Sequence, residues 1–331
     1  MAAPRADGPR RPDKVLWPEA GLTKQDLWDY VEAVAPRLLP AIAGRPLTLK
    51  RFPDGLHGQG WFQKDLPTSA LDHIDHVRRW SPSARREVTY AVARTPDHLR
   101  WLADQAALEL HPMLARVEDP DAPDALVLDL DPPAAADPPA AADPPAAPAP
   151  APTLAQAAHW VRAVLERLGL PSRVKTSGKA GLHLVVPVAP GAEPARLRAL
   201  ALAIGRAAVL AHPRALTVEM RKERRAGRLL VDWSRASPAQ TVVAAWSPRA
   251  TPQATVATPL DWDEVTEDLD PTTLTLRTAP QRHDPWAEPM AAATHADLAR
   301  AEATLAAQGI AIVDRSPRSS RPVEDLDRPG G

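Results

Sequence analysis

The sequence lacks cysteine altogether, is poor in aromatic residues and contains no long hydrophobic run. With no Cys among 331 residues, a disulfide scaffold, a Cys-type zinc finger, an iron–sulfur site and thiol catalysis are excluded. Any metal must therefore be held by Asp, Glu and His. No run of about 18 uncharged apolar residues occurs, and the N-terminus has no apolar signal core. We expect a soluble, cytoplasmic protein that does not bind a membrane.

Charge is balanced over the whole sequence but not along it. There are 40 Lys+Arg against 41 Asp+Glu, a formal net charge of −1. Residues 151–250 nevertheless carry sixteen basic and five acidic groups, whereas 251–331 carry seven and fourteen. A basic middle beside a local set of acids is typical of proteins in which phosphates meet carboxylate-held metal. Solvated, Arg-rich helix faces are the alternative, and charge alone does not separate the two.

Proline and alanine divide the sequence into ordered and extended stretches. We expect residues 1–12 and 315–331 to be disordered tails that flank one domain over 13–314. Within that domain, residues 132–153 are rich in Pro and Ala and contain repeats of Asp-Pro-Pro-Ala-Ala. Because proline lacks an amide donor, this stretch is predicted to be a solvated loop insertion.

The hydrophobic pattern predicts helices that alternate with strands. Helices are expected from Thr23 onward, over 154–168 and over 193–211. Short apolar runs between helix breakers predict strands over 47–51, 126–131, 182–188, 228–232 and 240–244. This alternation predicts a mixed α/β or α+β fold.

Three aspartates at predicted strand ends form the first candidate site. In Asp129-Leu130-Asp131 both carboxylates leave the strand on one face, because strand side chains alternate. Two acids so close repel each other unless they share a cation, and hard oxygen ligands suit Mg²⁺ or Mn²⁺. Asp232 ends another apolar run and would complete the three carboxylates used in two-metal nucleotidyl transfer. Exposed acids at a strand end are the alternative, and spacing does not show whether the three meet.

A glycine-rich turn and a basic tract supply candidate phosphate ligands. In residues 175–183 glycines allow backbone amides to turn toward an anion, with Ser177 and His183 beside them. The Walker spacing is missing, so this is no P-loop, and a simple Gly-rich hairpin is the alternative. Arg225 lies in a basic cluster before the third aspartate, and Arg249 follows it. Such cations would balance the charge of a triphosphate.

Basic and aromatic residues interleave in the first part of the chain. Lys50 precedes an Arg-Phe pair, and Trp61, Phe62 and Lys64 follow within one short segment. This mixture suits stacking on nucleotide bases. Packing of the Trp-Phe pair in a hydrophobic core is the alternative.

Together these segments resemble the polymerase domain of bacterial ligase D, within the archaeo-eukaryotic primase superfamily. The resemblance runs in order from residue 13 to about 270. It is carried by motifs that include Asp13-Lys14-Val15-Leu16-Trp17-Pro18, Leu108-Glu109-Leu110-His111-Pro112, Asp129-Leu130-Asp131-Pro132, Thr176-Ser177-Gly178, Gly181-Leu182-His183 and Val231-Asp232-Trp233. It implies a primase-polymerase fold, in which an RRM-like catalytic sheet packs on an N-terminal α/β portion.

The resemblance also implies a function and a set of site residues. The function would be that of a nucleotidyltransferase, a DNA-directed or primase-like polymerase that adds deoxy- or ribonucleotides to 3′ ends in double-strand break repair by non-homologous end joining. Two ions, Mn²⁺ or Mg²⁺, would be held by the catalytic residues Asp129, Asp131 and Asp232. Nucleoside triphosphates would be bound by Lys50, His111, Ser177, His183 and Arg249, with His111 beside the sugar.

DNA ends are the macromolecular partner that the resemblance implies. The matching DNA-binding residues are Lys14, Lys24, Trp61, Phe62, Lys64 and Arg225, of which the first two would hold a downstream 5′-phosphate. A Ku-type end-binding protein and a separate ATP-dependent DNA ligase would act alongside, and the protein would be associated with the nucleoid.

Departures from the family pattern keep other functions open. Ala180 stands where the family has a lysine, and Ala236 and Ala239 replace an Asn and a Gly. They favour, as the alternative, a catalytically weakened paralogue that binds DNA ends. A phosphatase with Asp129 as nucleophile is a third hypothesis, but Pro133 stands where that chemistry uses Thr or Val, so we expect no such activity.

Overall fold

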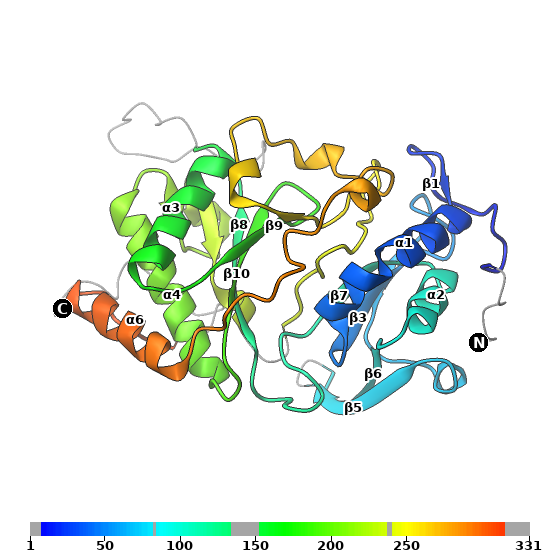
Figure 1. The fold of residues 1–331 in the computed structure, drawn as a ribbon, viewed down its shortest axis with the longest axis horizontal. Coiled ribbons are helices and arrows are strands. Elements are labelled where there is room, and N and C mark those ends of the chain that lie inside the picture. Colours follow the sequence, from blue (N-terminus) through cyan, green and yellow to red (C-terminus); the bar gives the residue numbers. More distant parts are fainter. Residues whose placement is uncertain (1–7, 82–83, 134–151, 237–239, 315–331) are drawn as a thin grey trace.

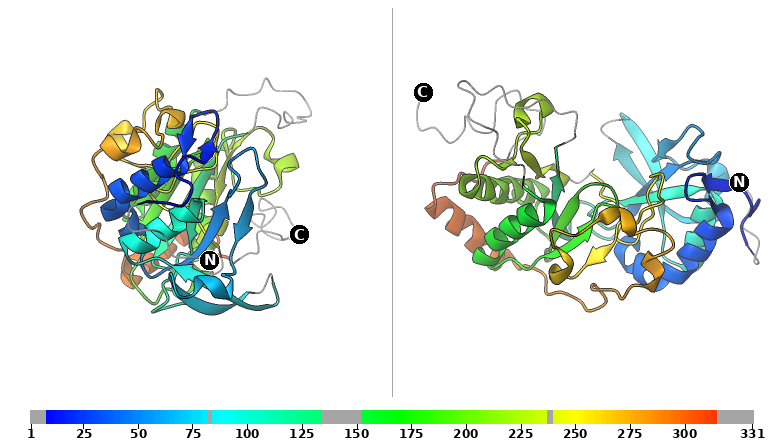
Figure 2. Two further views of the ribbon diagram at one scale, coloured as in Figure 1. Left: turned by 90° about the vertical axis from the view of Figure 1, so that its right-hand side faces the viewer. Right: turned by 90° about the horizontal axis from the view of Figure 1, so that it is seen from above.

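The protein consists of two lobes, each built around its own sheet (Figure 1; Figure 2, right). The computed structural model describes residues 8–81, 84–133, 152–236 and 240–314. Most of the predicted insertion over 132–153, residues 1–7 of the predicted N-terminal tail and all of the predicted C-terminal tail lie outside these ranges. Residues 8–12 of the predicted N-terminal tail are described, and Arg10 there donates hydrogen bonds to Asp104. Among the residues described, no helix combines the length and the apolar character that a membrane span requires. The mixed α/β class predicted from the sequence is confirmed.

The N-terminal lobe packs two helices on an antiparallel sheet of five strands. Strand β3 is central, and it pairs with β4, β6 and β7. The elements are β1 (Val15–Trp17), β2 (Leu22–Thr23), α1 (Lys24–Ile42), β3 (Pro46–Arg51), β4 (Trp61–Gln63), β5 (Asp75–Ser81), β6 (Arg86–Val92), α2 (Pro96–Asp104) and β7 (Ala107–Pro112).

Helix α1 begins where the sequence predicts it. The Thr23 hydroxyl accepts a hydrogen bond from the Asp26 amide, and the Asp26 carboxylate accepts one from the Thr23 amide. This reciprocal cap satisfies two amides that have no partner inside the helix. The apolar stripe of α1, which includes Leu27 and Val34, is buried in the lobe core.

The second lobe has a six-stranded sheet in the order β11-β12-β8-β10-β9-β13. Its elements are β8 (Ala125–Asp131), α3 (Leu154–Arg167), β9 (Arg173–Thr176), β10 (Leu182–Pro187), α4 (Pro194–Ala211), β11 (Leu216–Thr217), α5 (Lys222–Arg225), β12 (Leu229–Asp232), β13 (Pro259–Leu260) and α6 (His295–Ala307). In chain order, β8-α3-β9-β10-α4-β12 is a split β-α-β arrangement.

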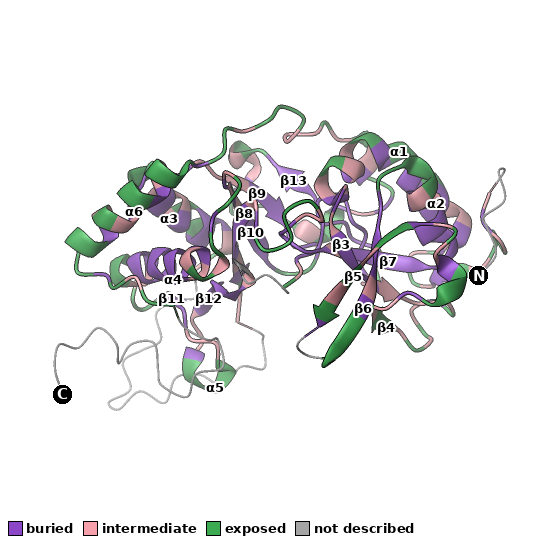
Figure 3. Ribbon diagram, turned by 90° about the horizontal axis from the view of Figure 1, so that it is seen from below, coloured by how far each residue is buried: buried purple, intermediate pink, exposed green. Residues whose placement is uncertain are grey.

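Among the described residues, the long helices of this lobe cover one face of the second sheet. Alternate residues of β8, Leu126, Leu128 and Leu130, are buried against α3 and α4, and α6 packs on α4. In Figure 3 these three helices lie together on the side of the sheet away from the N-terminal lobe. The residues between them, Val127 and Asp129, therefore lie on the opposite face. That face is directed toward the N-terminal lobe.

After β12 the chain returns to the N-terminal lobe, then adds β13 (Pro259–Leu260) to the second sheet, and enters the N-terminal core again at Leu276 and Ala279. The predicted strand over 240–244 is wrong: Val242 and Ala244 donate amide hydrogen bonds to β7, but only an isolated bridge forms. The chain then turns away from β7 at Trp246, whose φ is 64°. The Trp246 ring is buried in the N-terminal core, and its carbonyl accepts a hydrogen bond from the Tyr30 hydroxyl at 2.8 Å.

Candidate active site

Four polar residues form a row across the uncovered face of the second sheet. The strand register places Asp232 opposite Asp129, Asp129 opposite His183, and His183 opposite Lys175. Directly paired residues of neighbouring strands point to the same side of a sheet. Asp131 lies two positions beyond Asp129 and so points the same way. The structure thus brings together the three aspartates that the sequence singled out.

Each of these carboxylates has an arginine partner. Nη2 of Arg235 lies 3.2 Å from Asp129 Oδ2 and 3.0 Å from Asp232 Oδ2. Nη1 of Arg225 lies 3.3 Å from Asp131 Oδ2. One guanidinium nitrogen therefore sits between two acids from neighbouring strands.

The carboxylates have the chemistry to hold a divalent ion. Among the described residues, no three His, Asp or Glu side chains are already arranged as a metal cluster. The position of the Arg235 nitrogen nevertheless shows that a cation can lie within 3.2 Å of oxygens from both Asp129 and Asp232. Hard carboxylate oxygens are the ligands that Mg²⁺ and Mn²⁺ prefer.

Burial and nearby charges shift the pKa values of Asp129 and Asp131 in opposite directions. Burial by itself would raise the pKa of Asp129, but His183, Arg235 and Lys175 lower it to about 2. The pKa of Asp131 is raised, first by burial and then by repulsion from Asp129, against the opposing effect of Arg225. Asp129 is therefore the more firmly ionised member of the pair.

Two buried bases complete the row. Burial, and then the charge of Lys175, lower the pKa of His183 to about 4, so its imidazole is neutral at pH 7. Its Nε2 lies 3.4 Å from Asp129 Oδ1, while its Nδ1 has no hydrogen-bond partner among the described residues. Burial, followed by the charge of Arg249, lowers the pKa of Lys175 to about 7. The sequence analysis did not assign Lys175 to the site.

The glycine-rich turn between β9 and β10 lies against the end of β8. The hydroxyl of Ser177 accepts hydrogen bonds from the amides of Lys179 at 3.2 Å and Gly181 at 3.1 Å. A Cβ on Gly181 would stand 2.4 Å from the Leu130 carbonyl oxygen, so only glycine allows this approach. The turn is thus held next to the paired aspartates on β8.

Arg249 connects this turn to the N-terminal lobe. Its Nη1 donates a hydrogen bond to the Ser177 carbonyl at 2.9 Å, and its Nε lies 3.4 Å from Oε2 of Glu109. Glu109 also lies near Lys50 (Nζ–Oε1 3.6 Å) and His111 (Nε2–Oε2 2.7 Å). Four of the five predicted nucleotide-binding residues therefore gather around one turn and one acid, and the fifth, His183, lies in the row.

Glu109 was missed in the sequence analysis, although it lies in a motif that carried the resemblance. The available signal was an acid at an inward position of an apolar strand, two residues before His111. Burial by itself would raise the pKa of Glu109, but His111 and Arg249 lower it to about 2.

The predicted DNA-binding residues fall into three separate places. Trp61 and Phe62 project from β4 with 44% and 59% of their surface exposed, so the alternative that they pack in the core is wrong. Phe62 contacts the His111 ring edge-on at 5.6 Å, and Lys64 is exposed just beyond β4. Arg225 is instead buried beside the acids of the second lobe.

Lys14 and Lys24 meet in a pocket of about 370 Å³ at the far side of the N-terminal lobe. The pocket is also lined by Arg11 and Arg51. Lys24 is largely buried and pairs with Asp104 at 2.8 Å, whereas Lys14 pairs with an exposed acid at the rim. The pocket is rich in cations and accessible from outside.

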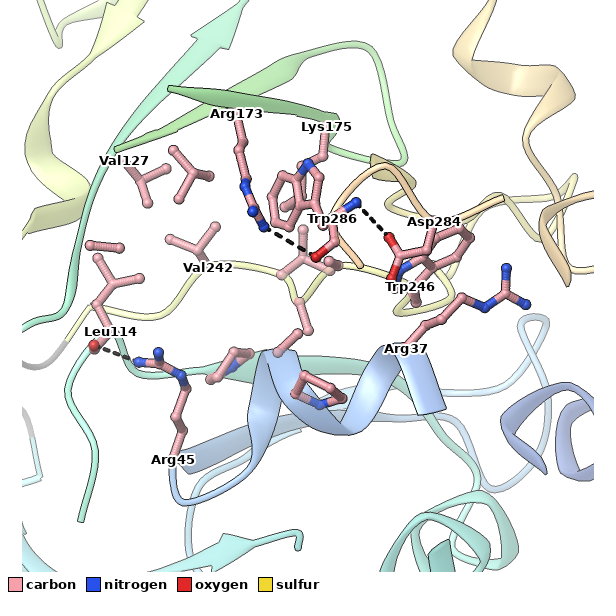
Figure 4. Close-up of a pocket in the computed structure, with 18 of the residues that line it drawn as sticks. Arg37, Arg45, Leu114, Val127, Arg173, Lys175, Val242, Trp246, Asp284 and Trp286 are labelled. Atoms are coloured by element: carbon pink, nitrogen blue, oxygen red, sulfur yellow. Dashed lines mark hydrogen bonds between the residues drawn. The ribbon is translucent and has the colours of Figure 1, made fainter. Parts of the chain in front are cut away.

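An apolar cavity of about 510 Å³ lies between the lobes beside the row (Figure 4). Val127, Val242, Trp246 and Trp286 line it, and Lys175 lies at its wall. The arginines in its wall donate to backbone carbonyls, as Figure 4 shows for Arg45 and Arg173. These hydrogen bonds connect separate chain segments that form the walls of the cavity.

Comparison with known proteins identifies relatives over most of the chain. The family described as LigD, primase-polymerase domain, matches residues 23–290. The multifunctional non-homologous end joining protein LigD of Mycolicibacterium smegmatis is 36% identical over 258 residues, covering 77% of this chain and 32% of that protein. The bifunctional LigD of Bacillus subtilis is 28% identical over 296 residues, covering 86% and 45%.

A solved structure agrees with these relatives. The polymerase domain from Mycobacterium tuberculosis ligase D, in complex with DNA, matches with a TM-score of 0.73 and 33% identity. The match covers 83% of this chain and 93% of that one. The chain spans about a third of the length of the mycobacterial LigD proteins it matches.

Proposed function

Because the chain belongs to the primase-polymerase domain family of LigD, we propose that it is a nucleotidyltransferase that extends 3′ ends at DNA double-strand breaks. The observation that best supports this is the register of Asp232 opposite Asp129, with Asp131 on the same face and a glycine-rich turn beside them. Nucleotidyl transfer needs this combination of metal-binding acids and phosphate ligands in one place.

Each part of the site has a role in this reaction. Asp129, Asp131 and Asp232 would hold two Mn²⁺ or Mg²⁺ ions, which when bound activate the primer 3′-OH and neutralise the departing pyrophosphate. Arg249 and Lys50 would offset the charge of the triphosphate. Because its pKa is low, His183 would act there as a neutral hydrogen-bonding group.

The turn contributes donors as well as shape. The Ser177 hydroxyl oxygen already accepts hydrogen bonds from two backbone amides. Its own proton can therefore be donated to a phosphate oxygen. His111, between Phe62 and Arg249, would lie beside the sugar of the incoming nucleotide.

DNA would be held outside this pocket. The exposed rings of Trp61 and Phe62 would stack on bases, with Lys64 beside them. The pocket that contains Lys14 and Lys24 would take a downstream 5′-phosphate.

Arg225 would contact DNA only if its ion pair with Asp131 were broken. A Ku-type end-binding protein and a separate ATP-dependent ligase are the proposed partners at the nucleoid.

The direct test is extension of a gapped, 5′-phosphorylated duplex by purified protein, with Mn²⁺ or Mg²⁺ and with each nucleotide type. Asp129→Asn and Asp232→Asn should each lower the rate by about 100-fold or more, because they remove charge that the transition state needs. Asp121→Asn, at an exposed carboxylate near Arg79, is the matched control and should extend normally. Undiminished extension by both site variants would contradict the proposal.

A catalytically weakened DNA-end-binding paralogue is the second candidate. It is favoured by Ala180, exposed in the turn where the family has a lysine, and by the arginines that already pair with all three acids. It predicts binding of 5′-phosphorylated ends without incorporation. Robust incorporation by the wild-type protein would exclude it.

A further inference from the structure

The cavity between the lobes has the size and the lining of a small-molecule site (Figure 4). Its volume of about 510 Å³ lies within the range of about 300–1,000 Å³ that is typical of ligand pockets. Its apolar lining consists mainly of Val127 and Val185, from the uncovered face of the second sheet, with Val242, Trp246 and Trp286. Walls that are apolar and partly aromatic favour a flat hydrophobic ligand.

The cavity has a rim in contact with solvent and a buried interior. Pro36 and Pro40, on α1, and Ala287 line it and are exposed. Val127 and Lys175 line it as well, with only 1% and 3% of their surface exposed. A ligand that enters at the rim would therefore be largely removed from water, as in most small-molecule sites.

Most charged groups of the wall already have partners. Its arginines donate to backbone carbonyls or to a carboxylate: Arg37 to Pro280 and Arg282, Arg45 to Leu114 and Asp124, and Arg173 to Trp286. The carboxylate of Asp284 accepts the Trp286 amide at 2.9 Å. Even with Arg45 neutralised by Asp124, the cations of the wall outnumber its one acid, so the cavity favours an anion.

Two donors in the wall lack adequate acceptors. The indole Nε1 of Trp286 is buried and has no hydrogen-bond partner in the described part of the chain. The ammonium group of Lys175 has three N–H bonds, but it donates only to the adjacent Thr176 carbonyl, at 3.3 Å, within the ranges described. No described carboxylate oxygen lies within 4.0 Å of this amine. An acceptor with a negative charge would satisfy both donors and balance the charge of the lysine.

We propose that the cavity binds a small aromatic acid, whose ring lies between the apolar walls and whose carboxylate accepts hydrogen bonds from Lys175 and Trp286. The site is separate from the proposed triphosphate and DNA contacts, so the inference does not depend on the polymerase function. Lys175 is also the last residue of the polar row, opposite His183. A bound acid would therefore place a negative charge beside that row.

Binding can be tested with 2-naphthoate, a flat aromatic carboxylate, and with 2-naphthalenemethanol, its uncharged counterpart. Isothermal titration of the purified wild-type protein measures both affinities. We expect one naphthoate per chain, bound about tenfold more tightly than the alcohol, because only the carboxylate balances the charge of Lys175. No saturable binding of naphthoate, or equal affinity for the two compounds, would overturn the inference.

Lys175→Met tests whether the carboxylate meets the lysine. Methionine keeps an unbranched apolar side chain and removes the amine, so naphthoate should bind about tenfold more weakly while the alcohol binds as before. Lys222→Met, at an exposed lysine on α5 outside the cavity lining, is the matched control and should bind both compounds as wild type does. Undiminished naphthoate binding by Lys175→Met would contradict the proposal.

Ala41→Phe tests whether the ring occupies the cavity. Ala41 lines the cavity from α1 and is only partly buried, so a larger side chain there fills the space. This variant should lose binding of both compounds. Ala33→Phe, at an exposed position of the same helix that does not line the cavity, should retain it. Equal affinities in the two variants would place the ligand elsewhere and refute the inference.

Trp286→Phe keeps the test decisive if Lys175→Met does not fold. Phenylalanine preserves an aromatic wall and removes only the indole N–H. Naphthoate should bind about fivefold more weakly, and the circular dichroism spectrum should match that of wild type. Naphthoate binding that is unchanged in Trp286→Phe would show that this donor does not meet the carboxylate, which would overturn the proposed site.

Discussion

A buried acid that is held ionised makes the stability of this protein depend on pH. The pKa of Glu109 is lowered from 4.5 to about 2, despite burial, because His111 and Arg249 favour the carboxylate. A depressed pKa contributes stability that is complete above the unfolded value near 4.5 and is lost as the pH falls toward 2. Glu109→Gln should therefore be less stable than wild type at pH 6, by on the order of 3 kcal/mol, with the gap narrowing at pH 3. Urea unfolding at the two pH values measures this, and a constant gap would contradict it.

Gly181 should tolerate no side chain, since the Leu130 carbonyl would lie 2.4 Å from its Cβ. Gly181→Ala must displace either the turn or β8, at a cost of about 2 kcal/mol, and primer extension should fall because Ser177 moves with the turn. In Gly309→Ala the φ of 77° is also strained, but no atom lies within 4 Å of the new Cβ. That control should lose about 1 kcal/mol and keep full activity. Equal activity losses in the two variants would argue against the steric explanation.

Some residues of the site can be predicted from the sequence and others cannot, for a physical reason. Asp129, Asp131 and Asp232 could be selected because alternation along a strand determines the face to which a side chain points. Glu109 and Lys175 are also strand residues, but a charged residue inside an apolar run does not show which partners meet it in space. The contacts of Arg249 with Ser177 and Glu109 join residues far apart in the chain. Such contacts follow from the packing of the lobes.

Between elements, the buried acid Asp104 ties α2 to α1 and to the N-terminal segment. It accepts hydrogen bonds from Lys24 at 2.8 Å and from the Arg10 amide and Nε, both at 2.8 Å. Asp104→Asn leaves the buried Lys24 amine without its counter-charge and should cost about 3 kcal/mol in urea unfolding. Asp97→Asn, on the exposed first turn of α2, should cost less than about 1 kcal/mol. Similar losses in both variants would show that the buried pair contributes little.

The elements predicted correctly are those with strong local patterns. Helix α1 has a capping box and an apolar stripe, and α3 and α4 follow clear helical periodicity. Helix α6 was not predicted, because alanines make up most of its apolar positions and give a weak stripe. The segment over 240–244 has the composition of a strand, but its pairing with β7 stops after a single bridge.

At the scale of the whole molecule, the pocket around Lys14 and Lys24 should make DNA binding depend on both salt and the 5′-phosphate. Each phosphate contact that is lost lowers the slope of log affinity against log salt by about 1. Lys14→Ala should reduce the slope by about that amount for 5′-phosphorylated ends and not for 5′-hydroxyl ends. Arg300→Ala, on the outer face of α6, should leave both slopes unchanged. Fluorescence anisotropy at several salt concentrations tests this, and identical slopes for Lys14→Ala and wild type would refute it.

The packing of residues that follow β12 in the N-terminal core has a consequence for biosynthesis. Trp246, Val256 and Leu276 are buried with the first helices and strands of the chain. During synthesis, the hydrophobic core of the N-terminal lobe therefore stays incomplete until these side chains have left the ribosome. A protein truncated before residue 240 would leave apolar residues of that core exposed and would aggregate. Proteolytic cleavage between the lobes would not release two independently stable fragments.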